Sequence, residues 1–197
     1  MLVSEPVNLP LSDRKQGSWK ETWHSIRADY SRLSDWAADR ESLYSNPLFS
    51  LSFLSVFLYR ISRYLYTRRL TLPARLIWQT NLFLTGADLN PISSTGPGLV
   101  IIHPPSVTLV GSAGRNLTIE GLGGLGGGMD LRDIGAGPGL PLLGDDVYLQ
   151  RGAMVLGPVV IGNRVTVAAG CTVTRDIQPD HQVLPHKIRI RSGNLDR

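Results

Sequence analysis

Residues 143–177 read LGDDVYLQRGAMVLGPVVIGNRVTVAAGCTVTRDI, and apolar side chains return in this stretch every six residues. One series consists of large aliphatic residues. A second series, which includes smaller side chains, follows it four residues behind. The two series are Leu143, Leu149, Val155, Ile161, Val167 and Val173, and Val147, Ala153, Val159, Val165, Cys171 and Ile177. A period of six matches neither an ordinary strand nor an α-helix. It is typical of a short strand followed by a corner, three of which close one triangular coil of a parallel β-helix.

The same register extends toward the N-terminus, and we expect the β-helix to span residues 86–180. The earlier members of the two series are Ala113, Leu117, Ile119, Leu125 and Met129. Between residues 129 and 141 the register is broken by a segment rich in Gly, Pro and Asp, which predicts a loop that leaves the coil. Long loops in compact domains are usually functional or mobile, so this one is a candidate lid.

Residues 18–85 predict helices instead. A stripe of large side chains at spacings of three and four marks the packing face of an amphipathic helix: Trp19, Trp23, Ile26, Tyr30, Leu33 and Trp36. Ser18 and Glu21 have the spacing of a capping box. Asn46-Pro47 interrupts the chain, and further helices are expected over 48–66 and 71–84. The fold class is therefore α+β, with residues 1–17 a flexible N-terminus, the helices covering one end of the β-helix, and 181–197 a C-terminal tail.

Composition excludes several classes of protein. The 197 residues carry 20 Lys and Arg against 16 Asp and Glu, a net charge of +4, without the basic run and interleaved aromatics expected of a nucleic-acid-binding surface. Cys171 is the only cysteine, which rules out an intramolecular disulfide, and the four histidines lack metal-ligand spacing. Residues 1–10 do not read as a signal peptide, and the apolar run 47–59 is too short for a membrane span. We expect a cytoplasmic protein without a metal.

His103 follows an apolar run, residues 99–102, and precedes Pro104-Pro105, so it lies at a strand end on rigid backbone. From this context alone a structural role is the default interpretation. A resemblance changes that interpretation. Residues 84–91, LTGADLNP, are similar to the stretch ending in D-I-H-P of the serine acetyltransferases, within the hexapeptide-repeat acyltransferase superfamily, and residues 101–103 resemble that family's L-D-H. The sequence separation of Asp88 and His103 equals that of the family's catalytic Asp and His.

Two further segments carry the same resemblance. Residues 116–127, NLTIEGLGGLGG, resemble the strand and glycine loop that lead to the family's CoA site, and residues 141–173 align without gaps to its final coils. Residues 185–188, PHKI, resemble its P-A-R-I segment.

The resemblance implies a left-handed β-helix and a CoA-dependent acyltransferase with acetyl-CoA as the expected donor. It assigns His103 as the general base and Asp88 as the carboxylate that orients the imidazole. The donor would contact the chain at Gly126, Gly127, Ala153, Ala169 and Lys187. A three-sided prism also pairs naturally with threefold symmetry, so we expect a homotrimer or a dimer of trimers, with active sites between subunits.

The departures from the family concern the acceptor. Ile102 stands where the family has an Asp, and Gly139 and Leu140 replace the Arg and His of its R-H-P segment. These three positions would otherwise recognise the charges of serine, so we expect transfer to a hydroxyl or amine of a small molecule other than free serine. Two alternatives stay open: a genuine serine O-acetyltransferase of cysteine biosynthesis whose serine pocket uses other residues, and a non-catalytic scaffold that binds a partner protein.

Overall fold

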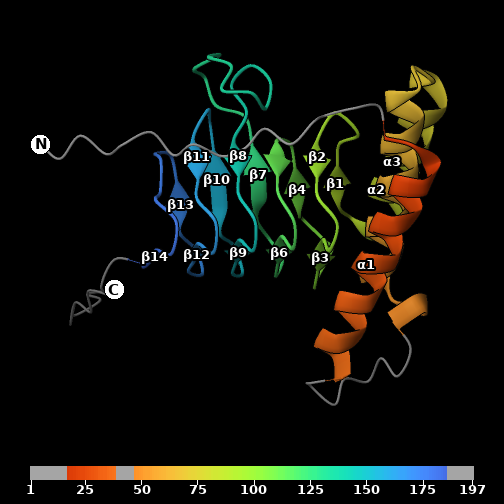
Figure 1. The fold of residues 1–197 in the computed structure, drawn as a ribbon, viewed down its shortest axis with the longest axis horizontal. Coiled ribbons are helices and arrows are strands. Elements are labelled where there is room, and N and C mark those ends of the chain that lie inside the picture. The colour runs from red at the N-terminus through yellow and green to blue at the C-terminus, as the bar shows by residue number, and fades with distance from the viewer. Residues whose placement is uncertain (1–16, 39–46, 186–197) are drawn as a thin grey trace, which may run out of the picture.

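The computed structural model describes residues 17–38 and 47–185. The chain begins with the helices α1 (Trp19–Ala38), α2 (Leu51–Thr67) and α3 (Thr71–Thr85), with a short 3-10 helix η1 (Pro47–Phe49) before α2. Strands follow from residue 88 onward. The helices lie together at one end of a long stack of strands (Figure 1), so helices and strands occupy separate parts of the molecule, as expected. Among the described residues no helix is long and apolar enough to cross a membrane.

The strands form three parallel sheets. Sheet A contains β1 (Asp88–Leu89), β4 (Thr108–Leu109), β7 (Gly124–Gly126), β10 (Met154–Leu156) and β13 (Thr172–Val173). Sheet B contains β2 (Ser94–Thr95), β5 (Ser112–Ala113), β8 (Leu142–Leu143) and β11 (Val160–Ile161). Sheet C contains β3 (Val100–Ile101), β6 (Thr118–Ile119), β9 (Tyr148–Leu149), β12 (Thr166–Val167) and β14 (Gln182–Val183). Successive strands belong to different sheets, which is the topology of a three-sided parallel β-helix.

The hexad series form the core of this prism. All six residues of the first series are buried, and in the second series only Ile177, at the last corner, is partly exposed. Partners on adjacent strands, such as Val100 and Thr118, are separated in the sequence by one coil of three hexads. Thr118 and Tyr148 also pair, but they lie farther apart in the sequence because the loop is inserted into the coil between them.

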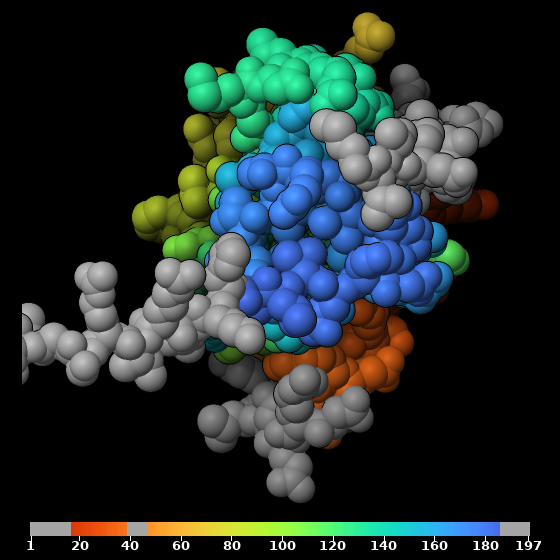
Figure 2. Space-filling view, turned by 90° about the vertical axis from the view of Figure 1, so that its left-hand side faces the viewer, coloured from red at the N-terminus to blue at the C-terminus, as the bar shows by residue number. Residues whose placement is uncertain are grey.

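The predicted loop does leave the coil, between β7 and β8, and it projects from one corner of the prism (Figures 1 and 2). The Asp133 carboxylate accepts hydrogen bonds from the backbone of Gly135 at 2.7 Å and Gly137 at 3.0 Å, which closes the tip of the loop. The assignment of Met129 to the second core series was wrong, because the chain has already left the coil there and this side chain is fully exposed.

The capping box at the start of α1 is confirmed: Ser18 N donates to Glu21 Oε2 at 2.6 Å, and Glu21 N donates to Ser18 Oγ at 3.2 Å. The predicted packing face of α1 is buried only in part. Ile26 and Leu33 are buried, whereas Trp19 and Trp23 are 49% and 41% exposed. The Trp19 ring contacts Tyr64 of α2 edge-on, so at this level α1 packs against α2.

A buried ion pair ties the helices to the first coil. Arg60 of α2 donates to both carboxylate oxygens of Asp29 in α1, at 2.8 and 3.0 Å, and the two side chains are 5% and 1% exposed. Asp29 Oδ1 also accepts from Gly98 N and Leu99 N at 2.8 and 2.7 Å. Burial alone would lower the pKa of Arg60, but the Asp29 carboxylate outweighs it and the pKa is raised. The pair joins two helices to the backbone of the β-helix.

Candidate functional site

His103 lies on the corner between β3 and β4, with an exposed side chain. Its backbone N–H donates to Glu120 O at 2.9 Å, which fixes the corner against the next coil. The side chain opens into a pocket of about 300 Å³ at the junction of α1 and sheet C. The pocket is lined by Trp36, Ile102, His103, Glu120, Tyr148 and Arg151.

The coil register explains why these residues meet. Ile102 N donates to Ile119 O at 3.0 Å, and Glu120 N donates to Leu149 O at 2.9 Å, so positions 102, 120 and 150 stack on successive rungs. Rungs of a sheet are about 4.8 Å apart. The next positions, 103, 121 and 151, stack in the same way, which places Arg151 two rungs from His103. Residues far apart in the sequence therefore share one edge of the prism.

The Glu120 carboxylate is held from two sides. The Tyr148 hydroxyl donates to Oε1, and the backbone N–H of Arg151 donates to Oε2 at 2.8 Å. Sequence reasoning did not identify Glu120, Tyr148 or Arg151. Their signal was the hexad register itself: Glu120 and Tyr148 adjoin the core positions 119 and 149, so both must point outward on neighbouring rungs.

Asp88, the first residue of β1, lies in sheet A and is half-buried. Its Oδ1 accepts a hydrogen bond from the Trp78 indole N–H at 2.8 Å. Within residues 17–38 and 47–185, no hydrogen bond joins Asp88 to the His103 ring. Their segments do pair, since Ser106 N donates to Gly86 O at 2.9 Å and Asp88 N donates to Val107 O at 2.8 Å. The dyad itself stays a prediction.

The predicted donor residues fall on two edges of sheet A. Gly126 ends β7 and Gly127 begins the loop, with partly or fully exposed backbone. Ala169 is exposed on the same edge as His103, and its N–H donates to Gln150 Oε1 at 3.1 Å. Ala153 lies on that edge too, but its side chain is fully buried, and its N–H and C=O bond to Gln150 O and Gly124 N. Lys187 lies outside the described residues.

The three positions that replace the family's acceptor-binding groups offer no charge, for structural reasons. Ile102, 9% exposed, belongs to an apolar cluster that includes Ile26 and Phe53 of the helices. Gly139 is buried with φ of 71°, and a Cβ there would lie 2.9 Å from Asp130 O, so the loop requires glycine at this point. Leu140 packs its side chain beside Gly127 and Gly137.

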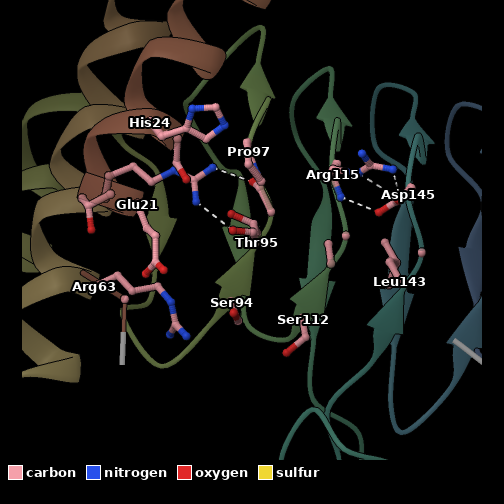
Figure 3. A pocket seen from close by; sticks show the side chains of 18 of the residues that line it. Glu21, His24, Arg63, Ser94, Thr95, Pro97, Ser112, Arg115, Leu143 and Asp145 are labelled. Carbon is pink, nitrogen blue, oxygen red and sulfur yellow. Dashed lines mark hydrogen bonds and ion pairs between the residues drawn. The ribbon is translucent and has the colours of Figure 1, made fainter. Parts of the chain in front are cut away.

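A larger cavity, of about 560 Å³, lies between the helices and sheet B and contains none of the predicted site residues. Figure 3 shows its polar walls, with His24 and Arg63 from the helices and the paired Arg115 and Asp145 from the coils. Burial raises the pKa of Asp145, but hydrogen bonds from Arg115 outweigh it and hold the pKa below its ordinary value. Among the described residues, Thr95 Oγ1 is a buried side-chain atom without a hydrogen-bond partner, and it lies at this cavity. No described group of three or more His, Cys, Asp or Glu side chains is placed to hold a metal ion.

Comparison with known proteins identifies the class first. Residues 141–175 match the family described as bacterial transferase hexapeptide (six repeats). The crystal structure of Neisseria gonorrhoeae serine acetyltransferase superimposes with a TM-score of 0.75 at 25% identity, covering 86% of this chain and 67% of that one. The fold and the repeat thus define a hexapeptide-repeat transferase with a left-handed parallel β-helix.

Similar proteins of known name narrow the assignment from hexapeptide-repeat transferases in general to one family. Serine acetyltransferase of Helicobacter pylori (strain ATCC 700392 / 26695) is 32% identical over 121 residues, 60% of this chain and 68% of that protein. Serine acetyltransferase of Bacillus pumilus is 30% identical over 147 residues, 71% of this chain and 64% of that protein. The chain belongs to the serine acetyltransferase family.

These findings confirm the family resemblance and the fold class. The chain spans 64% and 58% of the lengths of the Bacillus pumilus and Synechococcus elongatus relatives. The expectation of an acceptor other than free serine finds no support, because the relatives carry the name serine acetyltransferase. The alternative of a serine acetyltransferase whose pocket uses other residues fits the findings better.

Proposed function

We propose that the protein transfers the acetyl group of acetyl-CoA to the hydroxyl of serine. The observation that carries the proposal is the similarity to serine acetyltransferases over 71% of the chain. His103, whose side chain is exposed, is the residue that the resemblance of its motif assigns as the general base. A pocket beside this imidazole gives a small acceptor a place to bind.

His103 acts as the base in this proposal. An imidazole is largely neutral at pH 7 and can take the proton from the serine hydroxyl. Acetyl-CoA, when bound, supplies an activated thioester, so no covalent enzyme intermediate is needed. The serine oxygen bonds to the acetyl carbon, the carbon–sulfur bond breaks, and His103 passes the proton on to the departing sulfur. General base catalysis of this kind contributes about 10²–10⁴ in rate.

Asp88 orients the imidazole in this proposal and stabilises its protonated form. Its support is the family's spacing between the two residues and the pairing of its segment with the His103 corner, where Asp88 N donates to Val107 O at 2.8 Å. The Trp78 indole occupies one acceptor site of Oδ1, so the Asp88 carboxylate can still accept a hydrogen bond from the imidazole while that bond holds it.

The glycine run 126–128 suits the donor. A Cβ at Gly126 would lie 2.9 Å from Leu156 Cδ2, and one at Gly128 would lie 2.7 Å from Gly157 Cα. A side chain is excluded at Gly128, where the neighbouring atom is backbone, and the run as it stands presents backbone alone to any molecule that lies along this edge. The pantetheine arm of CoA is a thin chain of methylene and amide groups that can approach such a surface closely.

The proposed assembly is a trimer, or a dimer of trimers, in which the donor edge of one subunit faces the His103 edge of its neighbour. Apolar side chains on α3 are exposed and would be covered in the larger assembly, among them Leu72 at 69%, Leu76 at 56% and Phe83 at 87%. Light scattering at micromolar concentration tests the assembly. A monomer mass with full activity would contradict it.

The direct test of function is release of CoA thiol from acetyl-CoA in the presence of L-serine, with the product identified by mass spectrometry. We expect a kcat/KM for serine of about 10⁴ M⁻¹s⁻¹ or more, within the ordinary range of enzymes. Thiol release that does not depend on serine would overturn the choice of acceptor. Binding of CoA without any turnover would favour the scaffold alternative.

A further inference from the structure

We propose that Glu120 and Arg151 bind the two charged groups of the acceptor, the ammonium and the carboxylate of a hydroxy amino acid, in the pocket beside His103. This inference rests on the proposed function and deepens it. It assigns the acceptor subsite to residues that the family motifs do not mark.

An amino-acid acceptor carries both an ammonium and a carboxylate, and removing either from water without a partner is costly. A pocket that selects such a molecule therefore needs one anion and one cation close to the base. Ile102, Gly139 and Leu140 supply neither. The pocket around His103 does contain one of each: the Glu120 carboxylate and the Arg151 guanidinium.

Glu120 is placed to replace the carboxylate that Ile102 lacks. It stacks on Ile102 in the next rung, about 4.8 Å away along the prism. Its side chain is one methylene longer than that of Asp, which helps it to span this step. The Tyr148 hydroxyl and the Arg151 N–H each occupy one carboxylate oxygen. Each oxygen has two lone pairs, so the carboxylate can still accept an ammonium N–H while these bonds hold its orientation.

Arg151 lines the same pocket with an exposed side chain. In the part of the chain that the structure describes, its guanidinium forms no ion pair, and in particular none with the Glu120 carboxylate. Two opposite charges thus line one small pocket without neutralising each other. A guanidinium can hold a carboxylate through two parallel hydrogen bonds, which gives geometric as well as electrostatic selection. A zwitterion bound between Glu120 and Arg151 would satisfy both.

The test compares Glu120→Gln and Arg151→Gln with Arg164→Gln as the matched control, since Arg164 is an exposed corner arginine outside the pocket. Each of the first two variants should raise KM for L-serine about ten- to hundredfold, because each removes a charge-assisted hydrogen bond. The KM for acetyl-CoA and the melting temperature should stay near wild type, and kcat should change less than KM. If Glu120→Gln fails to fold, Glu120→Asp keeps the charge, withdraws it by one methylene, and should act in the same direction.

Two truncated acceptors separate the charges. Ethanolamine lacks the carboxylate, so its binding should be weakened by Glu120→Gln and not by Arg151→Gln. 3-Hydroxypropionate lacks the ammonium and should show the reverse pattern. Dissociation constants from NMR titration report on binding without turnover. A dissociation constant for serine within about threefold of wild type in either variant would overturn the inference.

The outcomes for the wild-type protein keep the two proposals apart. Serine turnover with unaltered serine binding in the variants overturns this inference and leaves the proposed function standing. Serine binding that the variants weaken, without any acetyl transfer, overturns the proposed function and supports this inference. A wild-type protein that neither binds nor acetylates serine overturns both.

Discussion

Replacing Asp29 with Asn tests how firmly the helices are tied to the β-helix. The substitution keeps the shape of the side chain and removes its charge. Arg60, 5% exposed, would then be a buried cation without a counter-ion. The Asn amide group would also turn donors toward the guanidinium, while one oxygen is left to serve Gly98 N and Leu99 N, which now share Oδ1.

Removing one partner of a buried ion pair costs about 3 to 5 kcal/mol. For a chain of this size that corresponds to a melting temperature lower by about 6 to 20 °C. Urea unfolding at fixed protein concentration measures the change with two probes. All four tryptophans, Trp19, Trp23, Trp36 and Trp78, precede the β-helix, so their fluorescence reports on the helices while circular dichroism reports on the whole chain. We expect the fluorescence transition to move to lower urea at least as far as the dichroism transition.

The matched control is Asp180→Asn. Asp180 pairs with Arg164 at 2.5 Å, but the two side chains are 60% and 58% exposed, so the same chemical change should leave the unfolding midpoint where it is. A loss below about 1 kcal/mol for Asp29→Asn, the range of exposed pairs, would refute the reasoning. So would an equal effect of the two substitutions.

Three other predictions concern catalysis, packing and pH. His103→Ala should abolish acetyl transfer and leave CoA affinity near wild type, because the predicted donor contacts do not include the His103 side chain. More than about half of wild-type activity would exclude His103 as the base. Gly124→Ala should prevent folding or lower the free energy of unfolding by several kcal/mol, because φ is 134° and the new Cβ would lie 1.9 Å from Thr108 O. Gly170→Ala is the control, since φ is 70° and no atom lies within 4 Å of the new Cβ, and its cost in a denaturation experiment should be far smaller. The lowered pKa of Asp145 means that its pairing with Arg115 stabilises the fold above pH about 4 and that this contribution is lost as the pH falls through the lowered value. The stability difference between wild type and Asp145→Asn should therefore shrink on acidification, and a difference independent of pH would contradict the assignment.

Sequence periodicity predicts those parts of this molecule in which residues at a fixed spacing are all buried in the same core. The hexads from Leu143 to Val173 all face one core, so their spacing alone was enough to predict these coils. The loss of the register between residues 129 and 141 predicted the loop before them. Met129 shows the limit of that pattern, because an apolar residue in the correct register carries no mark of whether the chain has already left the coil. Trp19 and Trp23 show the same limit for helices: their spacing predicts a packing face, and how much of it is buried depends on how far the neighbouring elements extend.

The sequence predicted where the candidate site lies better than it predicted which residues line it. The apolar run and the prolines around His103 indicated the corner, and the assignment of His103 as the base stays a prediction of the resemblance. The walls of the pocket come from other coils, and outward-facing positions such as Glu120 repeat no pattern. The hydrogen bond from Trp78 to Asp88 depends on side-chain rotamers, which spacing does not report. Ala153 could have been judged better from the sequence alone, because its membership of a core-facing series already implied burial.

The helices over the first coil also govern how copies of this chain can add to one another. The last coil of a β-helix presents a row of backbone donors and acceptors, and an uncovered first coil would accept it, so that molecules could polymerise end to end into fibres. Here β1 contacts α2 and α3, and β3 contacts α1 and α2, at the end of the stack where such a union would have to form (Figure 1). Fibre growth of this kind needs two complementary ends, and the helices block one of them. Side-by-side association through the faces of the prism is left available, so the same helices that close the core also favour closed assemblies over open-ended ones.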